Sequence, residues 1–340
     1  MKVARTTFPH APTTAPTVAV VLLAGGMRHS PLRQQLGVPS LCLPLSHDRT
    51  LLDHWLSTAE VLPQCRSVVI AVSGAEDAET IRKAVAARNR SIDVQVVIEP
   101  ATWRGPAGLL YDLVQGGRCG EPGEAGRVVV AGEASCLPPD DLEALIECLN
   151  RTSPGVSVTS RSGQPAGLYA LSDQALQMIP SIGFYDIKEQ LLPAMYSRGT
   201  PVQAMRTQTE TVRLWDRSSY LDAVRALQSR GSARDEASSH GDGTIIDDTA
   251  RLAGCCLIDR GAMVCDDAIV HESIVLCDAV IGQGAVVSNS VIGPGVTVQP
   301  GAVVKRAVLG STTHGMGRPA LRGLSEMFGL RTLWRGEGVS

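Results

Sequence analysis

The residue types best suited to chemistry are concentrated near the start of the chain, in residues 18–45. An apolar run, VAVVLLA, leads into the glycine pair Gly25-Gly26 and then into a basic loop that carries Arg28 and Arg33. A strand that turns at glycine presents backbone N–H groups to a phosphate, and arginines add positive charge. The pattern therefore favours a nucleotide or phosphate site. In the alternative interpretation, the glycines only make a tight turn and Arg28 is a surface charge.

The elements that would position this loop are apolar runs and helical patterns that alternate along residues 18–228. The predicted strands are Val18–Ala24, Ser67–Val72, Val94–Glu99 and Val128–Ala131. The predicted helices are Thr50–Glu60, Asp77–Ala87, Ala107–Gln115 and Asp140–Leu149. Such alternation is typical of an α/β fold, Rossmann-like with a mostly parallel sheet. Ligands of these sheets bind beyond the carboxyl ends of the strands, here near Gly25, Ser73, Glu99 and Gly132-Glu133.

Residues 244–310 carry a different pattern, an aliphatic repeat with a step of 17 residues. Three columns keep this step: Leu257, Ile274, Val291 and Val308; Leu252, Ile269, Val286 and Val303; and Val264, Ile281 and Val298. One inward aliphatic residue on each side of a triangular coil is the hexapeptide pattern of a parallel β-helix, here of about four coils. An ordinary antiparallel β domain is the alternative. The left-handed course is implied by resemblance to hexapeptide proteins.

The remaining segments complete a five-part organisation. We predict a disordered arm over 1–17, the α/β domain over 18–228, a linker over 229–243, the β-helix over 244–310 and a basic tail over 311–340. The tail is expected to form a helix that caps the coil, or alternatively to bind an anionic partner. Because the ends of a coil stack need caps or partners, homo- or hetero-oligomerisation through the β-helix is also expected.

Composition excludes several classes of function. The net charge of −3 argues against binding nucleic acid over the whole surface. Nine cysteines without a CxxC pair argue against a zinc finger, and their odd number favours reduced thiols. The start of the chain lacks an apolar signal region, and no run approaches the length of a membrane span. A cytoplasmic location is therefore expected.

Taken in order, these pieces resemble the sugar-1-phosphate nucleotidyltransferases that carry a C-terminal hexapeptide domain. The sequence Leu23-Ala24-Gly25-Gly26 matches the LAGG start of the family's phosphate loop. Glu99 with Gly105-Pro106-Ala107-Gly108 resembles the family's loop beside the nucleotide. The resemblance continues through the strand that ends at Glu133 and the segments 166–172, 186–199 and 215–223. It thus covers most of residues 18–310.

The resemblance implies a reaction in which a sugar 1-phosphate oxygen attacks the α-phosphorus of a nucleoside triphosphate and pyrophosphate leaves. Charge on the transferring group must be neutralised by N–H groups, a cation and Mg²⁺ held by carboxylates. By this resemblance Arg28 takes the place of the loop arginine, and Arg33 or His29 is the cation that compensates for the lysine that is missing at Ser40. Glu133 aligns with one metal ligand. The second is Asp216, or Arg213 occupies its place if the alignment has no gap.

Three functions remain open because parts of the family's machinery differ here. Ser40 stands where the family has a lysine, and no EKP motif, which grips the sugar and its phosphate, occurs. The first function is an active nucleotidyltransferase with an altered site. The second is a degraded homologue that binds a nucleotide sugar or acts as a regulatory subunit. The third is a hexapeptide acyltransferase with His271 as general base.

Overall fold

The computed structural model describes residues 17–25, 29–62, 64–88, 90–100, 104–120, 127–139, 142–152, 155–159, 165–207, 212–230 and 238–310. The predicted tail and residues 1–16 of the predicted arm lie outside these ranges, as do residues 231–237 of the predicted linker. The chain divides into two compact units. The first contains residues 1–26, 56–133 and 138–210, and the second contains residues 27–55, 134–137 and 211–340.

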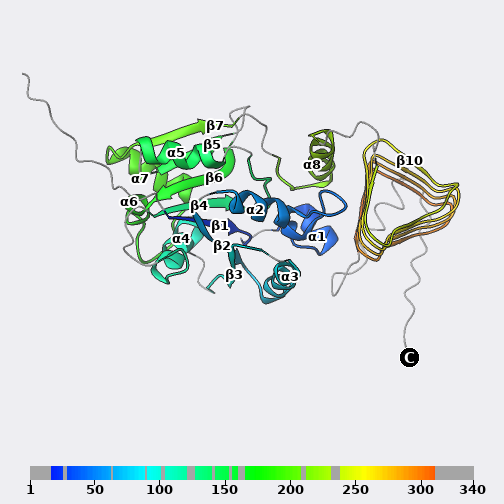
Figure 1. The fold of residues 1–340 in the computed structure, drawn as a ribbon, viewed down its shortest axis with the longest axis horizontal. Coiled ribbons are helices and arrows are strands. Elements are labelled where there is room, and N and C mark those ends of the chain that lie inside the picture. Colours follow the sequence, from blue (N-terminus) through cyan, green and yellow to red (C-terminus); the bar gives the residue numbers. More distant parts are fainter. Residues whose placement is uncertain are drawn as a thin grey trace, which may run out of the picture. The chain divides into compact units, whose positions relative to one another are not determined.

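The first unit is built on a seven-stranded sheet with the order β3-β2-β1-β4-β6-β5-β7 (Figure 1). Its strands are β1 Val18–Leu23, β2 Cys65–Val72, β3 Asp93–Ile98, β4 Val128–Glu133, β5 Gly155–Thr159, β6 Pro165–Ser172 and β7 Val202–Arg206. Strands β1 to β4 are mutually parallel, and β6 runs antiparallel to β4 and β5. The mostly parallel α/β sheet predicted from the sequence is confirmed.

Helices cover this sheet because its central strands are apolar on both faces. The helices that lie wholly in the first unit are α3 Ala75–Ala86, α4 Gly105–Gln115, α5 Leu142–Thr152, α6 Asp173–Leu176, the π-helix η2 Ile187–Leu191 and α7 Leu192–Ser197. Helix α2, Leu51–Glu60, is shared between the units. Residues of α4, α6, η2 and α7 form one core with alternate residues of β1, β2, β4 and β6. No helix in the described ranges combines the length and apolarity needed to cross a membrane.

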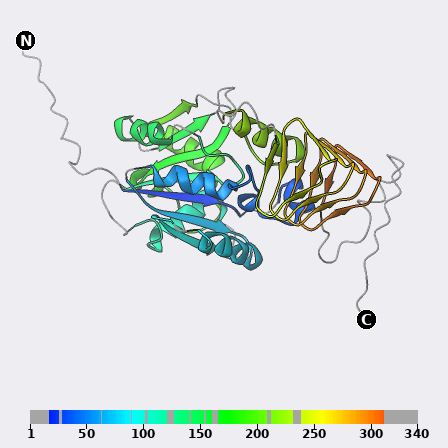
Figure 2. The ribbon, with the colours of Figure 1, turned by 45° about the vertical axis from the view of Figure 1, so that its right-hand side comes forward.

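The second unit contains a left-handed parallel β-helix, seen as the three-sided yellow and orange coil in Figures 1 and 2. Its first side consists of β10 Arg251–Ala253, β13 Ile269–His271, β16 Val286–Ser288 and β19 Val303–Lys305. The second consists of β8 Ser238–His240, β11 Cys256–Ile258, β14 Ile274–Val275, β17 Val291–Ile292 and β20 Val308–Leu309. The third consists of β9 Ile245–Ile246, β12 Met263–Val264, β15 Val280–Ile281 and β18 Thr297–Val298.

The predicted column Val264, Ile281 and Val298 is confirmed as interior. In the other two predicted columns Leu252 packs against the interior cluster, whereas the remaining residues are wrong by one position. The interior of the first side is lined by Val270, Val287 and Val304, and that of the second by Ile258, Val275 and Ile292. Many predicted inward residues have an aliphatic neighbour, as Val286 has Val287, and this neighbour also recurs every 17 residues. The 17-residue step therefore does not decide which of the two adjacent residues faces inward. In addition, Leu252 pairs with Val270, a step of 18, because the first coil holds one extra residue at its Gly254-Cys255 corner.

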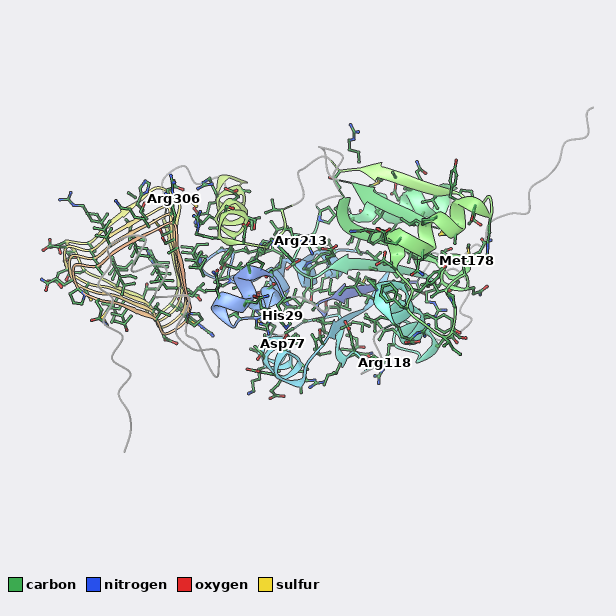
Figure 3. The ribbon with its side chains drawn as sticks, turned by 180° about the vertical axis from the view of Figure 1, so that it is seen from behind. His29, Asp77, Arg118, Met178, Arg213 and Arg306 are labelled. Carbon is green, nitrogen blue, oxygen red and sulfur yellow. The ribbon has the colours of Figure 1, made fainter. Side chains whose placement is uncertain are left out.

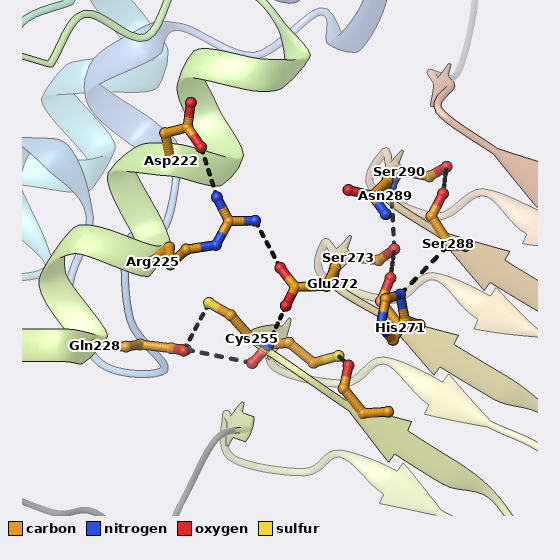
Figure 4. A network of polar contacts seen from close by, with 12 residues as sticks. Asp222, Arg225, Gln228, Cys255, His271, Glu272, Ser273, Ser288, Asn289 and Ser290 are labelled. Carbon is orange, nitrogen blue, oxygen red and sulfur yellow. Dashed lines mark hydrogen bonds and ion pairs between the residues drawn. The ribbon is translucent and has the colours of Figure 1, made fainter.

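The outer face of the second side is covered by helices of the same unit. Leu257, Ile274 and Val291 alternate with the interior residues, yet each is fully buried. Helix α1, Pro31–Leu36, packs against β20. Helix α8, Arg217–Arg230, contacts the corners of the coil through Arg225, whose guanidinium donates to Glu272 at 2.6 Å (Figure 4). The β-helix therefore has one side that faces protein.

Candidate functional site

The carboxyl ends of β1 to β4 meet at one edge of the first unit's sheet, as the predicted parallel pairing requires. Leu23 of β1 pairs with Glu133 of β4, and the Ala24 N–H donates to the Ala71 carbonyl at 2.8 Å. The Glu99 N–H, just beyond β3, donates to the Val72 carbonyl at 2.8 Å. The structure thus brings the predicted residues Leu23, Ala24, Gly25, Glu99 and Glu133 to a single edge, where ligands of such sheets bind.

Glu99 folds over Gly25. A Cβ atom added to Gly25 would lie 1.9 Å from Glu99 Oε1 and 2.5 Å from Glu99 Cδ, so glycine is what permits this approach. Burial raises the pKa of the Glu99 carboxyl above its usual value. The carboxylate is a hydrogen-bond acceptor held against the strand end, and a ligand that offers N–H or O–H donors would relieve part of its desolvation.

Glu133 faces a lysine that the sequence analysis did not identify. Lys188 Nζ lies 3.6 Å from Glu133 Oε1. The same ammonium interacts with the Tyr169 side chain, and this interaction is among the causes that raise the pKa of Lys188. Gly167 has a φ of +66°, and a Cβ there would lie 2.9 Å from Glu133 Cδ. Glycine at position 167 therefore leaves the space that the Glu133 side chain occupies. We call Glu133, Tyr169, Asp186 and Lys188 the Lys188 cluster.

The backbone around Lys188 is fixed from both sides. The Asp186 carboxylate accepts N–H bonds from Lys188 and Glu189 at 2.7 and 2.9 Å, which caps the π-helix η2. Ile187 and Leu191, on either side of Lys188, are buried in the core. Burial acts to lower the pKa of Lys188, but Tyr169 and Glu133 together raise it above its usual value. The ammonium is therefore a stable positive charge at the sheet edge.

The predicted nucleotide loop Gly105–Gly108 forms the first turn of α4. The N–H groups of Ala107 and Gly108 both donate to the Tyr185 carbonyl, at 3.1 and 3.2 Å. Gly105 has a φ of +74°, and a Cβ there would lie 2.6 Å from the Phe184 ring. These two N–H groups therefore bind the protein's own backbone, so they do not serve as phosphate donors in this conformation.

The other predicted residues belong to the second unit or lie outside the described ranges. Gly26 and Arg28 lie outside them. Arg33 is half-buried in α1, where its N–H donates to Ser30 Oγ at 3.1 Å. Asp216 caps α8 by accepting the Ser219 N–H at 2.9 Å, and this backbone hydrogen bond is the main cause that lowers its pKa.

Arg213, which takes the metal-ligand position in the ungapped alignment, is a stacking residue in the structure. Its guanidinium lies 4.7 Å from the centre of the Trp215 ring, and its Nε donates to Ser135 Oγ at 3.3 Å. Figure 3 labels Arg213, and also Arg306, which follows β19 at a corner of the coil. A cation stacked on an aromatic ring gains electrostatic attraction to the ring face.

His271, the base in the acyltransferase hypothesis, is exposed at the end of β13. Its Nδ1 lies 3.5 Å from Ser288 Oγ on the next strand. Beside it runs a ladder of corner serines (Figure 4): Ser273 Oγ donates to the His271 carbonyl and accepts the Ser290 N–H. Ser273 and Ser290 are fully buried, so the ladder satisfies backbone groups of the coil.

The groups around Glu133 do not fit Mg²⁺. The described residues contain no cluster of three acidic, histidine or cysteine side chains that would hold a metal ion. Mg²⁺ prefers six oxygen ligands in octahedral geometry. Here the Lys188 ammonium lies 3.6 Å from the Glu133 carboxylate, and this positive charge would repel a divalent cation bound to Glu133. Asp216, in the second unit, already directs its carboxylate to the first turn of α8.

Residues 233–314 match a family described as "GlmU-like, C-terminal hexapeptide". This supports the hexapeptide part of the resemblance, and it covers the β-helix of the second unit. No curated protein matches the chain.

Proposed function

We propose that this chain is a nucleotidyltransferase-like protein that binds a nucleotide or nucleotide sugar at the carboxyl edge of β1–β4, with little or no transferase activity. The observation that carries the proposal is the Glu99 carboxylate held over Gly25 at the end of the central strand. This carboxylate is a positioned acceptor at the edge where α/β sheets bind ligands. Ribose hydroxyls and base N–H groups are donors of the kind it would accept.

We expect weak nucleotidyl transfer because of the contacts that the other predicted site groups make and because of a residue that differs from the family. Transfer of a nucleotidyl group requires donors aimed at the charge that develops on phosphorus. Two N–H groups of α4 bind the Tyr185 carbonyl, and Glu133 is paired with Lys188. Ser40 occupies the position where the resemblance expects a lysine. Loss of one charge-stabilising donor commonly lowers a rate by about a hundredfold or more, and losses at several positions compound.

The test is to measure binding and turnover on the same protein. Isothermal titration calorimetry with ATP, UTP, UDP-glucose, ADP-glucose, dTDP-glucose and GDP-mannose is expected to show saturable binding of at least one ligand. Pyrophosphate release from nucleoside triphosphates with hexose 1-phosphates and Mg²⁺ is expected to stay at the blank. Sustained release would refute the loss of activity, and no binding of any ligand would refute the proposal as a whole.

A variant assigns the binding to the proposed edge. Glu99→Ala is expected to weaken binding at least about tenfold, because a hydrogen bond to a charged group contributes about 1.5–3 kcal/mol. The matched control is Glu79→Ala on α3, whose carboxylate lies 3.4 Å from Lys83 and is more than half exposed. Equal affinities of the two variants would place the ligand elsewhere.

A further inference from the structure

We infer that Lys188 takes the place of a divalent cation at this site, so that the chain binds the phosphate groups of its ligand without Mg²⁺. The inference rests on the proposed function, because it concerns the same sheet edge. It differs from what the resemblance implies, which is a metal held by Glu133. The disagreement arises from the contacts of Glu133 in the structure.

The first argument is the donor capacity of the ammonium. A lysine ammonium carries three N–H donors. In the described part of the chain, the ammonium forms an ion pair with Glu133, at 3.6 Å, and interacts with the Tyr169 side chain. The Lys188 side chain keeps 45% of its surface exposed, whereas that of Glu133 keeps 25%. Lys188 therefore has a donor and an open face for a phosphate oxygen.

The second argument is preorganisation. Lysine usually loses much side-chain freedom when it binds an anion. Here Asp186 caps the turn that carries Lys188, and Glu133 and Tyr169 hold its ammonium before a ligand arrives. Tyr169 itself is buried in β6 and keeps only 5% of its surface exposed. Much of the ordering cost is therefore met by the fold.

The third argument is charge balance. Two carboxylates accompany the ammonium in the Lys188 cluster: Asp186 accepts two backbone N–H groups, and Glu133 lies 3.6 Å from Nζ. A phosphate oxygen in direct contact with the ammonium is attracted to it over a shorter distance than it is repelled by either carboxylate. A dication bound to Glu133 would instead lie beside the ammonium and be repelled. Lys188 thus supplies the positive charge that the resemblance assigns to Mg²⁺ and to a lysine at the position of Ser40.

The experiment compares the affinity of the full chain for the same nucleotide sugars, UDP-glucose, ADP-glucose, dTDP-glucose and GDP-mannose, in excess EDTA and in excess Mg²⁺. Wild-type protein is expected to bind equally well, within twofold, in both. Lys188→Met is expected to bind about tenfold or more weakly in EDTA, from the loss of a charge-assisted hydrogen bond. In that variant Mg²⁺ is expected to restore part of the affinity, because the ammonium that would repel a dication near Glu133 is gone.

Lys83→Met is the matched control, since Lys83 is an exposed lysine on α3 of the same unit. If the wild type binds more than tenfold more weakly in EDTA than in Mg²⁺, the inference is overturned and the proposed function stays intact. Equal affinity of the Lys188→Met and Lys83→Met variants would do the same. Absence of binding to every probe in both buffers would overturn the proposed function and the inference together. The EDTA arm uses wild-type protein, so it decides the matter even if Lys188→Met fails to fold.

Discussion

Replacement of Gly25 by alanine is expected to weaken ligand binding at the end of β1 while it leaves the stability of the protein nearly unchanged. The new Cβ would lie 1.9 Å from Glu99 Oε1, whereas ordinary contacts begin at 3.4 Å. The carboxylate must therefore move by about 1.5 Å. It is the far end of a flexible, half-exposed side chain, so it can swing toward solvent. Gly25 is not among the residues with positive φ, and its backbone therefore accepts an L-residue.

Two opposing terms set the expected change in stability. Replacing glycine by alanine at a compatible position stabilises a protein by about 0.4–1 kcal/mol through the unfolded chain. Moving Glu99 from its rotamer costs about the same amount. The free energy of unfolding should therefore stay within about 1 kcal/mol of the wild type. Ligand affinity should fall about tenfold or more, because the acceptor is displaced.

The assay combines urea unfolding with calorimetric titration of the nucleotide sugar that the wild type binds. Gly74→Ala is the control, since a Cβ there meets nothing within 4 Å. The double variant Gly25→Ala with Glu99→Ala should bind like Glu99→Ala alone, because both changes act through one carboxylate. Equal affinity of the Gly25→Ala and Gly74→Ala variants would refute the reasoning, as would additive losses in the double variant.

Three further predictions concern stability and are checked by urea unfolding. Val287→Asp should lower the free energy of unfolding by about 4 kcal/mol or more, and Val286→Asp by far less, because only the first buries a charge inside the coil; equal losses would contradict the corrected inward column. Asp216→Ala should cost about 1 kcal/mol at pH 7 and Asp216→Asn much less. The cap lowers the pKa of Asp216 in the folded protein, so the carboxylate stabilises the fold fully above pH 3.8, its usual pKa. This stabilisation is lost as the pH falls through the lowered pKa of the folded protein, and Asp216→Asn should flatten the dependence of stability on pH. Tyr220→Phe should cost about 1–3 kcal/mol, because the buried hydroxyl donates to the Pro44 carbonyl at 2.7 Å; no loss would show that water replaces it.

The sequence predicted most of the fold because its signals are local and repetitive. The run VAVVLL has the continuous apolar character of a strand covered on both faces, and it became β1. The 17-residue step likewise predicted the coil. It failed to distinguish Ile269 from Val270, because both are aliphatic and only packing decides which one faces inward. The extra residue at the Gly254-Cys255 corner was invisible for a related reason, because steps of 17 and of 18 residues from Leu252 both reach an aliphatic residue, Ile269 or Val270.

The candidate site was predicted less well because its key contacts join distant segments. Lys188 lies 55 positions after Glu133, and nothing in the local sequence marks it as more than a charge near the start of a helix. Its role depends on Asp186 and on the antiparallel strand β6, which together bring it to the sheet edge. Asp216 shows the reverse case: the resemblance to the family suggested a metal ligand there, and in the structure Asp216 caps helix α8.

The contact between α1 and the end of the coil bears on how this protein is made. A Cβ on Gly310 would lie 1.5 Å from the Gln35 carbonyl, so these segments touch closely, yet Gly310 follows Gln35 by 275 positions. At about 5–20 residues per second, a ribosome needs roughly 14–55 s to synthesise that stretch. During this time α1, with Leu32 and Leu36 destined for burial, has no β20 to pack against. Leu32 and Leu36 of α1 thus stay without their β20 contacts until the end of the coil has been synthesised.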